Sequence, residues 1–376
     1  MRHPNQTGRV SLDRWLMNRD VLVASARLAA KSKGAGTPGV DGVRLNALTP
    51  AELNGLVSRL HADLCNDSYT PADLKVVVRR EGKKVRRFMI ATATDGVVQR
   101  ALRMGMEPAV ARALAPNYYS RRGLGPHAAV DAVLDALEAA DELTGAGAVH
   151  IIKADVEKYF DTIDHARLEG LIRSTFRGRR TMHLIRAFIE QGQFRRRRGV
   201  AQGSALSPLL AGWFMSPVDW YFHRRKTVFF ARYVDDVALV VPGDVVRAHE
   251  NLAELERQVH RLGLSLNKAK TTVVPVDKGI GFLGFHICRG AHGVEVVPSE
   301  RSIGKLQQKL DEVPDDGSTW QNLHLAKARW AAYLEPFVPD AMAIGNRAVE
   351  VEWAARLQQR PVQQTLGTSQ SSGGDH

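Results

Sequence analysis

The sequence lacks the features that define several classes of protein. It has two cysteines, Cys65 and Cys288, among 376 residues, and this number argues against a disulfide scaffold or a cysteine-rich zinc site. No apolar run approaches the ~20 residues that span a bilayer, and residues 1–15 lack the apolar core of a signal peptide. We find no internal repeat. We therefore expect a globular protein with a cytoplasmic location and no membrane partner.

The sequence also has fewer acidic than basic residues. The chain has 52 Lys+Arg against 40 Asp+Glu, a formal net charge of +12 and a pI near 9.9. Such an excess points to a polyanionic partner, most simply a nucleic acid. The basic residues gather in clusters, at 79–80, 83–87, 177–180, 195–198 and 224–226. Any one cluster fits a solvated surface, whereas several clusters near apolar elements fit an electrostatic track along a nucleic acid.

The most informative feature that is present is a pair of aspartates inside an apolar stretch. The tetrapeptide Tyr-Val-Asp-Asp at 233–236 separates the apolar runs 228–230 and 237–241, which predict two buried strands joined by a tight turn. Adjacent carboxylates repel each other, so burial requires a positive partner such as a divalent metal. Aspartate is also common in turns for its own hydrogen bonds, and the tetrapeptide alone leaves both explanations open.

A third aspartate follows another apolar strand. The run 148–152 leads directly to Asp155, so we expect this carboxylate at the end of a strand. Together with Asp235 and Asp236 it would place three acidic side chains on neighbouring strands, which suits two Mg²⁺ ions ~3.5–4 Å apart. Asp161 and Asp164 are better explained as acids near a helix N-terminus, where the helix dipole favours them.

A turn and a helix start lie between the two acidic sites. Residues 202–204, Gln-Gly-Ser, predict a compact turn where backbone can approach a ligand closely. Ser207 as N-cap and Pro208 at the first position then predict a helix within 206–222. Residues 74–78 and 85–90 predict two strands of a hairpin with basic residues at its tip. Residues 282–287 predict a strand, and residues 300–358 predict mostly helical structure.

In this order the motifs resemble those of reverse transcriptases. The Asp155 strand, QGSALSP, YVDD, LNKAKT (266–271) and GFLGF (281–285) are similar to palm motifs A to E. The fingers of group II intron-type bacterial reverse transcriptases are matched by GVDGV, YTP, EGKKVRRFMIAT and DGVVQRALRMGMEP, at 39–43, 69–71, 81–92 and 95–108. The resemblance covers roughly residues 30–340, and it is the ordered combination that is specific.

The resemblance implies an α+β fold, the right-hand polymerase fold, with fingers, a palm of antiparallel sheet and helices, and a short helical thumb. We expect an N-terminal extension and fingers over 1–145, and the palm over 146–290 with an insertion around 166–198. The thumb would cover 291–360, and the polar segment 361–376 would be a disordered tail.

The resemblance also implies metal-binding roles. Asp155, Asp235 and Asp236 match the carboxylates that hold two Mg²⁺ ions, for which Mn²⁺ is a possible substitute, and the Val156 carbonyl matches an additional metal contact. Lys270 matches the motif D lysine proposed to protonate the pyrophosphate leaving group. An ordinary surface lysine would leave the same pattern.

The remaining matches concern the incoming nucleotide. Phe160 matches the ring that excludes a 2′-hydroxyl and so favours dNTPs, although an ordinary core phenylalanine would look the same. Lys84 and Arg86 align with the residues that grip the triphosphate, in a register uncertain by one. Gln202 and Gly203 are implied to line the nucleotide pocket.

Some stretches depart from the family pattern. YVDD replaces the YADD common in intron enzymes, and YYSRRGLGP at 118–126 replaces the usual SYGFRP stretch, which puts template contacts there in doubt. We find neither the VTG triplet usual in retron enzymes nor an HNH endonuclease motif, and we expect no DNA-binding domain.

We therefore expect an RNA-directed DNA polymerase that adds dNTPs to the 3′ end of a DNA or RNA primer. Its template would be a structured non-coding RNA copied in antiphage defence. The alternative is a compact group II intron-encoded reverse transcriptase/maturase that acts chiefly as an RNA-binding splicing factor. Template-independent or protein-primed synthesis would use the same site, and the oligomeric state stays open.

Overall fold

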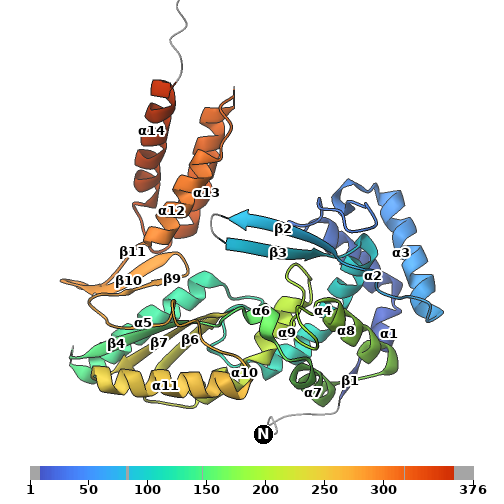
Figure 1. The fold of residues 1–376 in the computed structure, drawn as a ribbon, viewed down its shortest axis with the longest axis horizontal. Coiled ribbons are helices and arrows are strands. Elements are labelled where there is room, and N and C mark those ends of the chain that lie inside the picture. Colours follow the sequence, from blue (N-terminus) through green and yellow to red (C-terminus); the bar gives the residue numbers. More distant parts are fainter. Residues whose placement is uncertain (1–8, 82–83, 146, 317, 360–376) are drawn as a thin grey trace, which may run out of the picture. The chain divides into compact units, whose positions relative to one another are not determined.

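The computed structural model describes residues 9–81, 84–145, 147–316 and 318–359, with the backbone alone given for 79–81, 84–86 and 357–359. The chain divides into two compact units, Met1–Ile280 and Gly281–His376, and each is described by itself. Within the described residues, no helix is long and apolar enough to cross a membrane. Figure 1 shows the elements in chain order.

The first unit begins with a helical layer. Its elements are β1 (Val10–Ser11), α1 (Asp13–Leu16), α2 (Arg19–Ala30), the short 3₁₀ helix η1 (Leu45–Ala47), α3 (Pro50–Cys65) and α4 (Ala93–Ala113). Helix α3 starts at a capping box, in which Thr49 and Glu52 satisfy each other's backbone N–H groups. Helices α2, α3 and α4 pack together through side chains that are almost completely buried, such as Leu22, Leu60 and Leu102.

A two-stranded hairpin, β2 (Lys75–Glu81) with β3 (Lys84–Ile90), precedes α4. The GVDGV loop lies against the end of β3 and the start of α4. Asp41 accepts a hydrogen bond from the backbone N–H of Ala93 at 2.7 Å, and a side chain at Gly39 would collide with the Ala91 carbonyl. The loop therefore needs glycine at 39 and an acceptor at 41, which accounts for the GVDG pattern.

The centre of the first unit is a four-stranded antiparallel sheet in the order β6-β7-β4-β8. Its strands are β4 (Val149–Asp155), β6 (Phe229–Tyr233), β7 (Asp236–Pro242) and β8 (Thr272–Pro275). Helices α5 (Pro126–Thr144), α10 (Ser216–His223) and α11 (Val245–Arg261) pack against it (Figure 1). Strands β4 and β7 are buried along nearly their whole length. The residues of β7 after Asp236 are apolar, and in β4 the half-buried His150 and Lys153 interrupt the apolar residues that precede Asp155.

Several short elements connect β4 to β6. They are α6 (Tyr159–Thr162), α7 (His165–Thr175), β5 (Phe176–Arg177), α8 (Arg179–Gln191) and α9 (Ser207–Phe214). The helical pattern predicted around 206–222 forms two helices, α9 and α10, because a second Ser-Pro pair at 216–217 restarts the helix after Met215. Strand β5 pairs in parallel with β1.

The second unit contains a small sheet and three helices. Its elements are β9 (Ile280–Phe282), β10 (Phe285–Gly290), β11 (Gly293–Pro298), α12 (Glu300–Asp311), α13 (Thr319–Leu334) and α14 (Ala341–Gln359). The predicted strand over 282–287 is wrong in one respect, since Leu283 (φ 49°) and Gly284 (φ 100°) turn the chain and separate β9 from β10. The sheet has the order β11-β10-β9.

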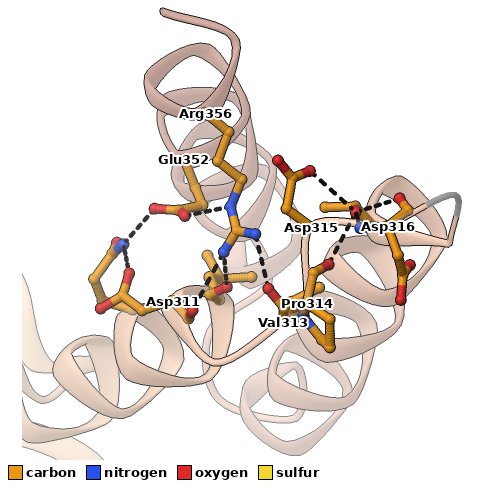
Figure 2. A network of polar contacts seen from close by, with 10 residues as sticks. Asp311, Val313, Pro314, Asp315, Asp316, Glu352 and Arg356 are labelled. Carbon is orange, nitrogen blue, oxygen red and sulfur yellow. Dashed lines mark hydrogen bonds and ion pairs between the residues drawn. The ribbon is translucent and has the colours of Figure 1, made fainter. Parts of the chain in front are cut away.

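Arg356 of α14 joins two helices of the second unit (Figure 2). Its guanidinium donates to the carbonyls of Leu310 and Val313, both at 2.7 Å, at the C-terminal end of α12. Its Nε donates to Glu352 at 2.6 Å. The last carbonyls of a helix lack the usual intrahelical donors. Arg356 adds a charged donor to the Leu310 carbonyl, which also accepts the N–H of Val313 at 3.2 Å, and another to the Val313 carbonyl, and so connects α14 to α12.

Candidate active site

The Tyr233–Asp236 segment is a two-residue hairpin turn. Tyr233 pairs with Asp236 across β6 and β7, so Val234 and Asp235 form the turn itself. Val234 has φ 58°, a left-handed conformation that suits a two-residue hairpin but is unfavourable for a β-branched residue by about 1–3 kcal/mol. The hairpin therefore presents Asp235 at its tip at the expense of backbone strain.

The three predicted aspartates come together at one end of the sheet. Asp155 is the direct partner of Asp236 across β4 and β7, and residues paired in this way lie close together on an antiparallel sheet. The backbone N–H of Val156 donates to the Asp235 carbonyl at 3.2 Å, which places Val156 between the two acidic segments. Tertiary structure thus gathers carboxylates that are about eighty positions apart in the chain.

The electrostatics of this cluster favour an added cation. Burial, followed by repulsion from Asp236 and Asp155, raises the pKa of Asp235 to about 6. Lys270 opposes this rise; its Nζ lies 2.6 Å from both carboxylate oxygens of Asp155. A buried set of like charges is stabilised by a counter-ion, and here a lysine side chain serves Asp155.

The donor set fits a divalent metal of the Mg²⁺ or Mn²⁺ kind, because carboxylate and carbonyl oxygens are the ligands that such ions prefer. Among the described residues, no group of three or more His, Cys, Asp and Glu side chains already forms a metal cage. Lys270 spans both oxygens of Asp155, so its ammonium and a metal would compete for the same carboxylate. The residues that would hold the ion are Asp155, Asp235 and Asp236.

The Gln202–Ser204 turn makes a close backbone contact with β3. Gly203 has φ 114°, and a Cβ there would stand 2.8 Å from the Met89 carbonyl. The N–H of Met89 donates to the Gln202 carbonyl at 2.8 Å. Only glycine fits both the positive φ and the space, so this turn connects the β2–β3 hairpin to the segment before α9.

The helix after this turn starts one residue earlier than predicted. Ser207 is the first residue of α9, and the N-cap is Leu206, not Ser207. The reason is a local turn in which the Ser204 hydroxyl accepts the N–H of Leu206 at 3.1 Å. The Gln202 side chain donates to Asp161 at 3.0 Å. Asp161 therefore has a tertiary partner besides its expected place in the first turn of α6.

The other predicted nucleotide-binding residues differ in how far the structure describes them. Phe160 lies in α6 and packs partly buried against the core, with its ring 5.8 Å from that of Tyr159 in an edge-on contact. This is compatible with a core role and with a role beside a sugar. The backbones of Lys84 and Arg86 lie in β3, but their side chains fall outside the described residues.

The sequence reasoning missed an ion pair beside the turn. Arg232 and Asp219 are both completely buried, and the Arg232 Nη2 lies 2.5 Å from an Asp219 oxygen. A signal was available, because an arginine in the middle of an apolar strand must have a buried acceptor. The partner on α10 is thirteen positions away and carries no motif.

Comparison with known proteins defines the class. The family described as Reverse transcriptase (RNA-dependent DNA polymerase) matches residues 79–287, more than half of the chain. The chain therefore belongs to the reverse transcriptase family. The right-hand polymerase fold follows from this membership together with the mixed helix and sheet architecture, and the protein is an RNA-directed DNA polymerase. The predicted resemblance to a bacterial, group II intron-like enzyme is confirmed by the relatives.

Protein YkfC of Escherichia coli (strain K12) is 29% identical over 339 residues, covering 77% of this chain and 87% of YkfC. Group II intron-encoded protein LtrA of Lactococcus lactis subsp. cremoris is 24% identical over 226 residues, which are 58% of this chain but only 36% of LtrA. A solved telomerase structure from Candida albicans, in complex with a TWJ fragment of telomeric RNA, covers 81% of this chain and 63% of that one. Its TM-score is 0.45 at 13% identity.

Proposed function

We propose that this chain extends a primer 3′ end with dNTPs at the Asp155, Asp235 and Asp236 cluster, using two divalent metal ions. The observation that carries this is the direct pairing of Asp155 with Asp236 beside the Asp235 turn. The three carboxylates, with the Val156 carbonyl, would hold two Mg²⁺ ions, or Mn²⁺ in their place. When bound, the ions would activate the attacking hydroxyl and neutralise the leaving pyrophosphate.

Other residues of the chain would supply a proton and bind the incoming nucleotide. Lys270 carries an ammonium beside Asp155, and a proton held there can be given to the departing pyrophosphate. Gly203 and Gln202 form the wall of the dNTP pocket, and Phe160 excludes a 2′-hydroxyl from it. Lys84 and Arg86 would hold the triphosphate through charge-assisted hydrogen bonds.

Primer extension on an RNA template tests this assignment. The double variant Asp235→Ala, Asp236→Ala is expected to lose at least about 10³-fold in rate, since each carboxylate would contact reacting charge. Asp131→Ala removes an exposed carboxylate on α5 and is the matched control with unchanged activity. Equal rates for wild type and the double variant would instead favour a protein whose palm is only a scaffold for binding RNA.

We further propose that the template is a structured non-coding RNA copied in antiphage defence. What supports a nucleic-acid partner is the net charge of +12 and its clustering. Sequencing of RNA that co-purifies with the protein tests the template: one discrete structured species is expected, and recovery of no discrete species contradicts the idea. Challenge of expressing cells with phage tests the defence role, in which wild type but not the double variant should protect.

The second candidate is a compact intron-encoded maturase. It is favoured by the match to LtrA, a group II intron-encoded protein, which aligns with 58% of the length of this chain. Such a protein would bind its intron RNA and promote splicing without needing the aspartates. Splicing of a candidate intron by the Asp235→Ala, Asp236→Ala variant at the wild-type rate would support this candidate. Loss of both splicing and extension in that variant would argue against it.

A further inference from the structure

The turn that carries Asp235 is held by a side chain from the preceding strand. Val234 adopts φ 58°, which a β-branched residue rarely does. The Nη1 of Arg232 donates to the Val234 carbonyl at 2.6 Å. That carbonyl belongs to the peptide that joins Val234 to Asp235, so its orientation sets where the Asp235 side chain begins.

Arg232 is itself immobilised. Its Nε and Nη2 donate to the two oxygens of Asp219 at 2.6 and 2.5 Å, a two-pronged contact between groups that are both 0% exposed. Nη2 also donates to the Gly212 carbonyl at 2.9 Å. A planar guanidinium with three acceptors in fixed directions has one orientation, whereas a lysine ammonium in its place could not reproduce the fork.

An aromatic ring completes the enclosure. The Arg232 guanidinium carbon lies 4.0 Å from the centre of the Tyr118 ring, within the range of a cation–π contact. Gly212 leaves room for that ring, because a Cβ there would collide with the Tyr118 hydroxyl. Gly212 is part of α9, which starts just after the Gln202–Ser204 turn. Arg232 therefore connects the Val234–Asp235 turn to helix α9, which follows the Gln202–Ser204 turn of the predicted nucleotide pocket.

Stability alone does not explain this arrangement. A buried ion pair gains little over apolar side chains of similar volume, because both ions lose their hydration. The neighbouring strand positions, Phe230 and Ala231, are apolar and buried. The charged side chain at 232 instead lies two residues before Val234, whose φ is positive. Its distinctive contribution is to hold a geometry that an apolar residue cannot hold.

We propose that Arg232, clamped by Asp219, is a positioning residue of the polymerase, which fixes the Val234 peptide and thereby places the Asp235 carboxylate relative to Asp155 and Asp236. It contacts none of the reacting groups and acts through the turn. The role rests on the proposed function, in which Asp235 is a metal-holding group.

The first test uses Arg232→Lys and Asp219→Asn, each compared with Phe222→Leu. Phe222 is buried on α10 and stacks on Phe230, so its replacement loosens the same helix and sheet without contacting the turn. Binding of Mn²⁺ to the protein alone, followed by electron paramagnetic resonance, is one readout. Primer extension kinetics at a temperature where all variants are folded is the other. Asp219→Asn keeps the partner's shape and carries the test if the lysine variant does not fold.

For both site variants we expect Mn²⁺ affinity and kcat to fall by roughly 10-fold or more, because small displacements of catalytic groups are costly. KM for dNTP should stay within about threefold, since the nucleotide pocket itself is unchanged. Phe222→Leu should lower the melting temperature but leave Mn²⁺ affinity and kcat unaltered. Site variants that behave like Phe222→Leu at an equal loss of melting temperature would overturn the proposal.

A double variant tests the turn directly. Glycine adopts a positive φ without strain, so Val234→Gly should restore Mn²⁺ affinity and kcat of Arg232→Lys by about threefold or more. Losses that are simply additive would overturn the positioning role. Asp235→Ala separates the metal site from the positioning role. If this variant binds Mn²⁺ as wild type does, the proposed metal site is wrong. If it loses Mn²⁺ binding while Arg232→Lys binds normally, only the role of Arg232 is rejected.

Discussion

At the scale of single residues, Asp235 shows how a functional group is kept at a cost to stability. Its pKa is raised to about 6, first by burial and then by Asp236 and Asp155, against the opposing effect of Lys270. In the absence of metal, the folded protein therefore favours the protonated form of Asp235 more than the unfolded chain does. A group of this kind destabilises the fold once it ionises.

The raised pKa of Asp235 makes its contribution to the stability of the fold depend on pH. The folded pKa of about 6 lies above the usual 3.8, so this contribution to stability is present below about pH 4 and is lost as the pH rises through 6. With metal chelated, we expect Asp235→Asn to stabilise the protein at pH 7 by on the order of 1–3 kcal/mol and to gain little at pH 4.5. Thermal unfolding at the two pH values measures the change in the free energy of unfolding. The control Asp131→Asn should give no difference between the two pH values. Equal gains in stability for both variants at pH 7 would contradict a specific effect of Asp235.

Gly203 is the second residue whose identity is set by geometry. Gly203→Ala adds both a strained positive φ and a Cβ 2.8 Å from the Met89 carbonyl, so we expect a loss of about 2–4 kcal/mol in stability. We also expect a rise in KM for dNTP, because β3 must shift. Gly145 also has a positive φ, of 61°, but lies in open space, so Gly145→Ala should cost about 1 kcal/mol with unchanged kinetics. Equal effects of the two variants, in unfolding and in primer extension, would refute the role of the close contact.

At the scale of elements, the ends of helices and strands carry most of the specific contacts. The backbone of β3 is hydrogen-bonded to the Gln202 turn, and Asp41 caps the start of α4. In the second unit, Arg356 supplies donors to the end of α12 (Figure 2). Each is a place where unsatisfied backbone groups would otherwise be left by the end of an element.

Replacement of Arg356 should loosen the second unit. Arg356→Met removes donors from the Leu310 and Val313 carbonyls and leaves Glu352 without this partner. We expect a loss of about 2–3 kcal/mol, since hydrogen bonds to charged groups are among the stronger ones. Urea unfolding measures the change. Arg347→Met, an exposed position on the same helix, should change stability by less than about 0.5 kcal/mol, and a similar loss for both would exclude a specific cap.

At the scale of the whole molecule, charge is the dominant property. A net charge of +12 spread over several basic clusters predicts RNA binding that depends strongly on salt, because each phosphate contact releases counter-ions. The chain belongs to the reverse transcriptase family, whose description names an RNA-dependent DNA polymerase, and RNA is therefore the nucleic acid to test.

We expect RNA affinity to fall by at least about 100-fold between ~50 and ~200 mM salt. Fluorescence anisotropy with a labelled RNA measures it. The Asp235→Ala, Asp236→Ala variant should keep the same salt slope and an affinity within about threefold, since the aspartates are not part of the basic track. Affinity that does not change with salt would show that phosphate contacts are not the main source of binding.

Local sequence patterns predicted the strands well where the pattern was strong. The apolar runs at 228–230, 237–241 and 148–152 correspond to β6, β7 and β4. The pattern failed where one residue changed the chain direction. Ser216-Pro217 split a predicted helix, Leu283-Gly284 split a predicted strand, and the Ser204 hydroxyl moved the start of α9. Such events depend on single backbone conformations that periodicity averages over.

The sequence by itself determined the strongly patterned strands, the carboxylates at their ends, and the family to which the order of motifs belongs. Only the tertiary structure decided which side chains meet: Asp155 opposite Asp236, Lys270 on Asp155, Gly203 against Met89, and Arg232 between Asp219 and Val234. The physical reason is that local patterns report burial and backbone preference, whereas partners distant in the chain are chosen by strand pairing and by the need to satisfy every buried charge.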